Sequence, residues 1–321
     1  MTASRYVRLT AKATDAVVLS DEVEWLKPFK EKRFFKLPID FQLNENAWYQ
    51  SGMIVGMDAA SVAAVWALQA ITGDVCLDLC CAPGMKLSLI SEIAGQANVF
   101  GTDVNEQRLD VCFNLLHKMG YSDLCRNIYQ IKSSSEGEVV RFEHIRKSRK
   151  RRGKKRQKID TDTESMNPLT QLYDRVLVDT ECSHDGSLRH VSKHTEGFWA
   201  RHSKDQQNRQ RYSTALEMEA LISLQQKLIT TGFERLKPGG VMVYSTCSLQ
   251  SQQNEEIVEY LLKTFPESAR PGRLPFACMN DPIDSQSLPV VPAKRVNEFS
   301  CLFHPDISGT SGQFIAVVCK I

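Results

Sequence analysis

The sequence has no hydrophobic run long enough to cross a membrane, and residues 1–22 lack the apolar stretch of a secretory signal peptide. The first acidic residue is Asp15, which leaves a mitochondrial presequence open as a weaker alternative. We therefore expect an intracellular protein that does not bind membranes. The nucleus, nucleolus or cytoplasm is favoured, with the mitochondrion as the alternative.

The chain also has little net charge and no cysteine pattern typical of a metal site. Its 40 lysines and arginines nearly balance 38 acidic residues, so any attraction to nucleic acid must be local. Ten cysteines lie mostly inside apolar runs, and Cys76, Cys80 and Cys81 lack the paired spacing of a structural zinc site. A chain of this size does not need a disulfide framework. We expect free thiols in a reducing compartment and no bound metal.

From residue 74 onward, short apolar runs alternate with segments of helical periodicity. The expected strands are DVCLDLCC (74–81), NVFGTDV (98–104), RNIYQI (126–131), YDRVLVD (173–179) and VMVYSTCS (241–248). The expected helices occupy about 85–94, 105–119, 214–235 and 253–264. This alternation predicts a doubly wound α/β domain, with a mostly parallel sheet covered by helices on both faces.

Three further segments frame this domain. QFIAVVCKI (313–321) predicts an antiparallel C-terminal edge strand in a closing hairpin. Residues 1–50 are less regular and predict a short α+β extension, which leaves 51–321 for the main domain. Residues 133–168 interrupt the alternation with serines and the basic run RKSRKRRGKKRQK (146–158), so we expect a mobile insertion there.

The loop after the first expected strand, LDLCCAPGMK (77–86), has features of a ligand-binding loop. Pro83 and Gly84 predict a tight turn, and glycine lets a ligand approach the backbone closely. A helix beginning near Met85 would point its N-terminal amides at that ligand. The spacing differs from the dinucleotide fingerprint, which favours another nucleoside ligand.

Asp103 ends the second expected strand, in GTDVNEQR. At this position a carboxylate can accept hydrogen bonds from two ribose hydroxyls. The alternative is structural, because Asp103 or Asn105 could cap the following helix. The strand context favours ribose binding.

Two cysteines follow the ends of two other expected strands. Cys182 lies shortly after Asp179, and Cys247 ends the fifth strand. Taken singly, each cysteine is more often a small buried hydrophobe than a nucleophile, but their joint position beside an aspartate favours chemistry. Asp179 could hydrogen-bond a base or donate a proton to its ring nitrogen. Groups that could stabilise a Cys247 thiolate flank it at Ser245, Thr246 and Ser248.

The order and spacing of these motifs resemble the Nop/Sun family of RNA cytosine-5 methyltransferases. The likeness spans about 50–320 apart from the insertion, and MDAAS (57–61) resembles the family's upstream QDAAS. The resemblance implies a Rossmann-like methyltransferase fold, S-adenosylmethionine as cofactor, and rRNA or tRNA as substrate. The cofactor-binding residues that it implies are Cys80, Cys81, Ala82, Pro83, Gly84, Met85, Lys86, Asp103, Arg108 and Asp179.

The resemblance also implies different catalytic roles for the two thiols. Cys247 would attack C6 of a flipped cytosine, and Cys182 would assist release of the product. Addition of a thiolate at C6, with N3 protonated by Asp179, makes C5 nucleophilic enough to accept a methyl group. The C5 proton then leaves before the thiol is expelled. Because the base must be unstacked, loops, ends or flexible RNA are the favoured targets.

Glu181 departs from the family pattern, which usually has proline before the first cysteine. Without proline the loop should be less constrained, and a neighbouring carboxylate should raise the pKa of Cys182. We expect retained methyl transfer with slower product release.

Other departures affect the cofactor site. Met85 and Met57 replace the usual glycine and glutamine, which could alter the geometry of the loop. KSSS follows the third strand where the family often has an aspartate that contacts adenine, so that contact is either missing or supplied by Ser133 or Ser134.

Two competing functions remain open at this stage. A catalytically impaired methyltransferase fold could serve as an RNA-binding assembly factor, and a small-molecule methyltransferase is disfavoured by the two cysteines. The basic run could contact phosphates, act as a nuclear import signal or simply be solvated. We expect a monomer whose partner is RNA. Since the N-terminal extension is short for an RNA-binding module, a protein partner could supply specificity.

Overall fold

The computed structural model describes residues 4–29, 33–131, 139–141, 167–187, 214–282 and 288–321. Ser133, Ser134 and the basic run 146–158 lie outside the described residues. No helix in the described ranges is long and apolar enough to cross a membrane.

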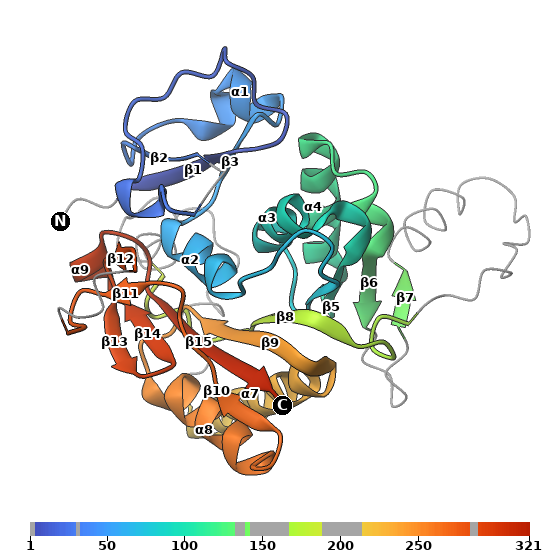
Figure 1. Ribbon diagram of the computed structural model, residues 1–321. Helices are drawn as coiled ribbons and strands as arrows, with labels where there is room; N and C mark the ends of the chain where they lie inside the picture. The colour runs from blue at the N-terminus through green and yellow to red at the C-terminus, as the bar shows by residue number, and fades with distance from the viewer. Residues whose placement is uncertain (1–3, 30–32, 132–138, 142–166, 188–213, 283–287) are drawn as a thin grey trace, which may run out of the picture.

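Within the described residues, a sheet of ten strands forms the centre of the molecule (Figure 1). Its five central strands are parallel, in the order β9-β8-β4-β5-β6. They are β4 (Cys76–Asp78), β5 (Val99–Asp103), β6 (Ile128–Ile131), β8 (Tyr173–Asp179) and β9 (Leu236–Thr246). These are the five strands expected from the sequence, and the doubly wound α/β fold is confirmed.

Antiparallel strands flank this parallel core. The C-terminal strand β15 pairs antiparallel with β9 and forms a hairpin with β14, and β13 lies beyond β14. The antiparallel C-terminal strand is therefore confirmed, with two more strands outside it. The flanking strands are β7 (Val139–Arg141), β10 (Ala269–Pro271), β13 (Lys294–Asn297), β14 (Ser300–Phe303) and β15 (Gln313–Lys320). A separate parallel pair joins β11 (Ala277–Cys278) and β12 (Val290–Val291).

Helices cover both faces of the sheet (Figure 1). On one face lie α2 (Ala59–Ala67), α3 (Met85–Ala94) and α4 (Glu106–Met119), and on the other lie α7 (Ala215–Glu234) and α8 (Glu255–Thr264). Side chains alternate along a strand, so Leu177 joins the first core while Val176 and Val178 join the second. Two short helices are α1 (Ala47–Gln50) and α9 (Pro305–Ser308).

The strand order places a topological switch point between β4 and β8. The chain moves outward from β4 through β5 to β6, and then returns to the other side of β4 for β8 and β9. In open α/β sheets, ligands bind outside the carboxyl ends of the strands at such a switch point. The loop of residues 80–86 that follows β4 (the cofactor loop) and the loop that follows β8 and carries Cys182 therefore meet at this switch point.

The N-terminal extension is a small antiparallel sheet in the order β2-β1-β3. Its strands are β1 (Arg5–Leu9), β2 (Phe34–Leu37) and β3 (Ile54–Gly56), so the third strand comes after residue 50. The sheet has its own apolar core, which includes Val7, Phe35 and Ile54.

A buried ion pair joins this extension to the main domain. The Arg8 side chain is 0% exposed and its Nη1 lies 2.6 Å from Oε1 of Glu92 in α3, while its Nη2 donates to Ser88 Oγ at 2.6 Å. The Tyr121 hydroxyl also donates to Glu92. Since isolated buried charges are costly, these contacts hold β1 against the helix that follows the cofactor loop.

We predict that Arg8→Met destabilises the protein by about 3–5 kcal/mol, because Glu92 is left buried without its cation. The free energy of unfolding in urea measures the effect. The double variant Arg8→Met/Glu92→Met should recover most of the loss, since neither charge then remains. An unchanged unfolding midpoint in Arg8→Met would show that the pair contributes no stability.

Candidate active site

The two predicted cysteines meet at the carboxyl ends of β8 and β9. The Sγ atoms of Cys182 and Cys247 are 3.2 Å apart. The parallel register pairs Asp179 with Ser245, so the loops after the two strands begin side by side. Asp179 ends β8 at the same edge. The structure thus brings together all three residues that the sequence suggested for chemistry.

His184 completes this cluster, although sequence reasoning missed it. Its Nδ1 lies 2.9 Å from Cys247 Sγ and 3.6 Å from Cys182 Sγ. The residue has a φ of 59°, in the left-handed region where a residue other than glycine costs about 1 kcal/mol. The available signal was a titratable side chain two positions after Cys182. Since only the fold places Cys247 beside that side chain, the signal was weak.

The cluster stabilises a thiolate. The pKa of Cys182 is lowered to about 5, first by the hydrogen bond from Cys247 and then by His184, which together outweigh burial. The hydrogen bond with Cys182 and burial raise the pKa of Cys247, and the hydrogen bond with Cys182 raises that of His184. The two sulfurs and the imidazole of His184 therefore share their protons, and a proton on the imidazole stabilises a thiolate on either sulfur. The expectation that Glu181 raises the pKa of Cys182 was wrong, because these hydrogen bonds dominate.

The loop around Cys182 is also held in place without proline. Buried Gln225 of α7 donates from Nε2 to the Glu181 carbonyl at 2.9 Å. The Gly186 N–H donates to the Cys247 carbonyl at 3.0 Å, and the Gly312 N–H donates to the Gly186 carbonyl at 2.7 Å. A Cβ added to Gly186 would lie 2.7 Å from the Cys247 carbonyl oxygen. The two glycines thus permit backbone contact against the cysteine loop.

Asp179 joins the cysteine loops to the cofactor loop through Lys86. Lys86 Nζ lies 2.7 Å from Oδ2 of Asp179, and Ser245 Oγ donates to Oδ1 at 2.6 Å. Burial lowers the pKa of Lys86, but the charges of Asp179 and Asp78 outweigh it and leave that pKa raised. Lys86 therefore keeps its proton beside Asp179.

The hydroxyls expected to stabilise a Cys247 thiolate have other partners. Ser245 Oγ donates to Asp179, and Thr246 Oγ1 donates to Asn254 Oδ1 at 2.6 Å. Ser248 Oγ lies 3.1 Å from Ser183 Oγ. These groups fix the turn around Cys247, while His184 and Cys182 contact its sulfur.

The cofactor loop is fastened to β5 and α4. The Ala82 N–H donates to Asp103 Oδ2 at 3.3 Å, and the guanidinium of Arg108 donates to the Ala82 carbonyl. Gly84 has a φ of +100°, and a Cβ there would lie 2.7 Å from Cys112 Sγ, so this turn requires glycine. Asn105, rather than Asp103, caps α4 by accepting from the Arg108 N–H.

Met57 and Met85, the two methionines that differ from the family pattern, both pack against the apolar core. Met57 is buried in the core between α2–α4 and the sheet, and Met85 packs against the same core at the start of α3. They fill apolar volume beside the cofactor loop.

An orphaned carboxylate shows what kind of ligand fits this loop. Asp78 ends β4 and is 1% exposed, and its Oδ1 has no hydrogen-bond partner among the described residues. Burial, followed by the charge of Asp179, raises its pKa to about 8. Three carboxylates, at Asp78, Asp103 and Asp179, face two cations, at Lys86 and Arg108. Burial keeps Asp78 mostly protonated near neutral pH, and a cationic nucleoside such as S-adenosylmethionine, with its sulfonium and ammonium groups, fits a site where this third carboxyl group can lose its proton and supply a further negative charge. Sequence reasoning missed Asp78.

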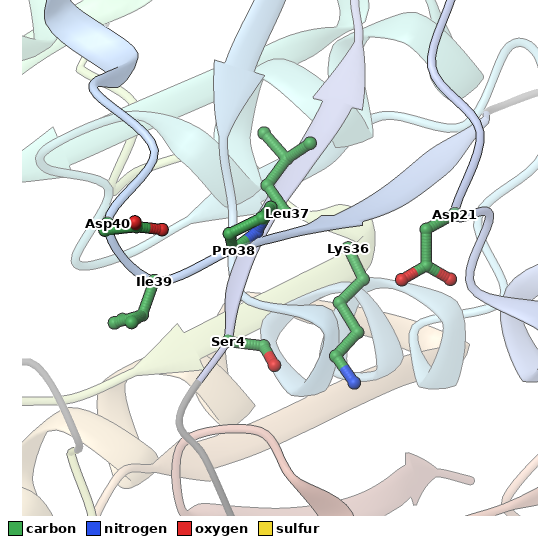
Figure 2. A pocket seen from close by; sticks show the side chains of 7 residues that line it. All are labelled: Ser4, Asp21, Lys36, Leu37, Pro38, Ile39 and Asp40. Atoms are coloured by element: carbon green, nitrogen blue, oxygen red, sulfur yellow. The ribbon is translucent and has the colours of Figure 1, made fainter.

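An open depression of about 540 Å³ lies elsewhere, on the N-terminal sheet (Figure 2). The side chains around it are those of Ser4, Asp21, Lys36, Leu37, Pro38, Ile39 and Asp40. Because it lies away from the ends of the parallel strands, we do not assign it a catalytic role.

The chain is similar to known methyltransferases. The family model described as 16S rRNA methyltransferase RsmB/F matches residues 65–140 and 133–295. The chain belongs to the RsmB/F family. S-adenosylmethionine is the cofactor of this methyltransferase family, which confirms the cofactor predicted from the sequence.

Curated RsmB/F relatives include ribosomal RNA small subunit methyltransferase B from Enterobacter sp., which is 28% identical over 215 residues. That alignment covers 67% of this chain and 40% of the relative. The protein of the same name from Salmonella paratyphi A is 28% identical over 221 residues, which cover 69% of this chain and 41% of the relative. The chain thus matches about two fifths of the length of these relatives.

Solved structures show the same fold. A methyltransferase homolog from Pyrococcus horikoshii has a TM-score of 0.63 at 21% identity, over 100% of this chain and 88% of that one. NSun6 from Pyrococcus horikoshii, solved with SFG, has a TM-score of 0.57 at 19% identity, over 86% of this chain and 56% of that one.

We predict that cofactor binding releases a proton from Asp78. With a pKa of about 8, this group is mostly protonated at pH 7, and an adjacent cationic ligand should lower its pKa. Affinity for S-adenosylmethionine should therefore rise with pH up to about 8 and then level off. Calorimetry in two buffers of different ionisation enthalpy measures the proton release.

Asp78→Asn should remove the proton release and weaken binding. The control Asp123→Asn changes an exposed aspartate away from the loop and should leave both unchanged. Equal proton release in Asp78→Asn and the wild type would assign the proton to another group.

Proposed function

We propose that this protein transfers a methyl group from S-adenosylmethionine to C5 of a cytosine in RNA, through a covalent bond between Cys247 and C6. The observation that carries the proposal is a thiol pair 3.2 Å apart beside the Lys86–Asp179 ion pair at the switch point. Methyl transfer to a nucleophilic oxygen or nitrogen needs no thiol. Carbon 5 of cytosine needs one, because it reacts only after a nucleophile has added at C6.

Residues around the cofactor loop would hold S-adenosylmethionine. Asp103 would accept from the ribose hydroxyls, the loop 80–86 would surround the ligand, and Asp78 would face its positive charge. When bound, the cofactor supplies the methyl group. Asp103 keeps its orientation through hydrogen bonds from the Ala82 and Asn105 N–H groups.

The division of roles between the thiols follows from their accessibility. Cys182 is 1% exposed, whereas Cys247 is only partly buried. A base that enters from solvent therefore meets Cys247 first. This supports Cys247 as the nucleophile and leaves Cys182 as the thiol behind it, as the sequence resemblance implied.

The chemical steps need a proton donor and a proton acceptor besides the nucleophile. As the Cys247 thiolate adds to C6, a proton passes from Lys86 through Asp179 to N3, which leaves C5 electron-rich. After methylation, the Cys182 thiolate accepts the C5 proton, the C5–C6 double bond forms again, and the bond between C6 and Cys247 breaks. The N3 proton returns to the Asp179–Lys86 pair, and Cys182 loses the C5 proton to solvent as the one proton that methyl transfer releases.

The proposed substrate is ribosomal RNA. The curated relatives are named for methylation of small-subunit rRNA, which favours rRNA over tRNA. Contact between phosphates and the basic run at 146–158 remains a prediction from the sequence. The cytosine must be turned out of any stack before Cys247 can reach C6.

We predict that Cys182→Ala accumulates protein bound covalently to RNA, because Cys247 can still attack while release fails. Cys247→Ala should form no adduct and lose methylation. Denaturing gels followed by sequencing of the attached RNA measure both results and identify the substrate.

The control Cys319→Ala changes a partly buried cysteine in β15 and should behave as the wild type. An adduct that persists when both Cys182 and Cys247 are replaced would refute the assigned nucleophile. If no variant forms an adduct and the wild type binds RNA without methylating it, the assembly-factor function would be supported instead.

A further inference from the structure

We propose that His184 is a catalytic residue that takes the proton from the Cys247 thiol before attack and returns it when the thiol leaves. The inference rests on the proposed function and adds a third participant to the thiol pair. It comes from the position of one ring nitrogen and from the way the backbone holds it there.

Nδ1 of His184 lies closer to Cys247 Sγ than the Cys182 sulfur does. Its Nδ1 is 2.9 Å from Cys247 Sγ, within hydrogen-bond distance, and 3.6 Å from Cys182 Sγ. A general base must lie within such reach of the proton that it removes. The Cys182 sulfur, at 3.2 Å from Cys247 Sγ, is the other group that could receive this proton.

Both neighbours of His184 are anchored to the segment that carries Cys247. The Ser183 N–H donates to Gln253 Oε1 at 2.9 Å, and Gln253 Nε2 donates back to Ser183 Oγ at 2.9 Å. Asp185 accepts from the Leu249 N–H at 3.3 Å. The residue between these two anchors therefore keeps a fixed position relative to Cys247.

The backbone conformation at position 184 adds an independent argument. Its φ of 59° lies in the region that glycine adopts without strain, yet the chain has histidine there. The other non-glycine residue with positive φ in the described ranges is Gln69, which lies away from the thiols. A histidine with a strained backbone and a ring nitrogen in contact with Cys247 Sγ indicates that the imidazole has a function at this position.

The charged groups around the ring favour its protonated form once a thiolate exists. The groups that act on His184 are Cys182, Glu181 and Asp179, and all of them raise its pKa against the effect of burial. Of these groups, Asp179 is itself paired with Lys86. Imidazolium and thiolate therefore stabilise each other, which is the arrangement that activates cysteine nucleophiles.

The step balances without any other reactant. The S–H bond of Cys247 breaks and an N–H bond forms at Nδ1 of His184, which gives a thiolate and an imidazolium. The thiolate electron pair forms the bond to C6. When that bond breaks after methylation, the pair returns to sulfur and the thiolate takes the proton back from Nδ1.

The test measures the ionisation of Cys247 directly, in full-length protein prepared with a chelator. In a Cys182→Ala background, the rate of Cys247 alkylation by iodoacetamide is followed against pH, and peptide mapping identifies the modified residue. Two variants are added to this background. His184→Asn keeps a residue that tolerates positive φ, and His184→Gly removes the strain.

Both variants should move the pH midpoint of Cys247 alkylation upward by at least about one unit, which lowers the rate at neutral pH about tenfold. Added imidazole should restore part of the rate in His184→Gly by entering the vacated space. The control His117→Asn changes an exposed histidine on α4 and should leave the profile unchanged. The same variants should shift the acidic limb of the pH profile of methylation.

An unchanged alkylation profile in both His184 variants would overturn the proposal and leave His184 a structural residue. Alkylation needs neither RNA nor cofactor, so this result is independent of the methyltransferase function. If the His184 variants shift the alkylation profile of Cys247 but the wild type methylates no RNA, the proposed function is refuted. The role of His184 in ionising Cys247 is then still supported.

Discussion

The parallel pairing of β8 with β4 on one side and with β9 on the other is the constraint on which the site depends. It sets the carboxyl ends of three strands side by side, so the cofactor loop and both cysteine loops open at one edge. The Lys86–Asp179 ion pair then crosses the switch point from the start of α3 to the end of β8. One polar contact thus links the part that would hold the cofactor to the part that would hold the base.

The ionisable groups at the carboxyl ends of the parallel strands depend on one another because they are buried. Asp78 lacks a hydrogen-bond partner for one oxygen among the described residues, Asp179 is paired with a lysine, and the two sulfurs share a charge beside an imidazole. In a site of low polarity each group is stable only with its counter-charge. A ligand that brings positive charge therefore completes the balance, and loss of any one partner changes the protonation of the others.

The sequence predicted much of this structure because its strongest signals are local. Buried strands such as YDRVLVD and VMVYSTCS read as apolar runs, and their alternation with helical segments limits the topology to a parallel sheet. Asp179, Cys182 and Cys247 were recognised because each follows such a strand. The family resemblance then gave these residues roles that composition alone does not supply.

The features that escaped prediction depend on long-range contacts. His184 contacts Cys247 across 63 positions of sequence, and nothing local distinguishes it from a surface histidine. The lowered pKa of Cys182 was missed for the same reason, since Glu181 is adjacent in sequence but the controlling hydrogen bonds come through space. Likewise, the hydroxyls beside Cys247 were assigned to its sulfur because their real partners, Asp179 and Asn254, were not visible as neighbours.

The contact between Gly186 and Gly312 limits how this active site can change during evolution. A Cβ on Gly312 would lie 2.8 Å from the Cα of Gly186, and one on Gly186 would press on the carbonyl of Cys247. Neither position can gain a side chain without a shift of the backbone around Gly186, Gly312 or Cys247. A change of side chain at either position must therefore be accommodated on both sides of this contact, so the turn before β15, although distant in sequence from Cys182, is structurally part of the loop that carries Cys182.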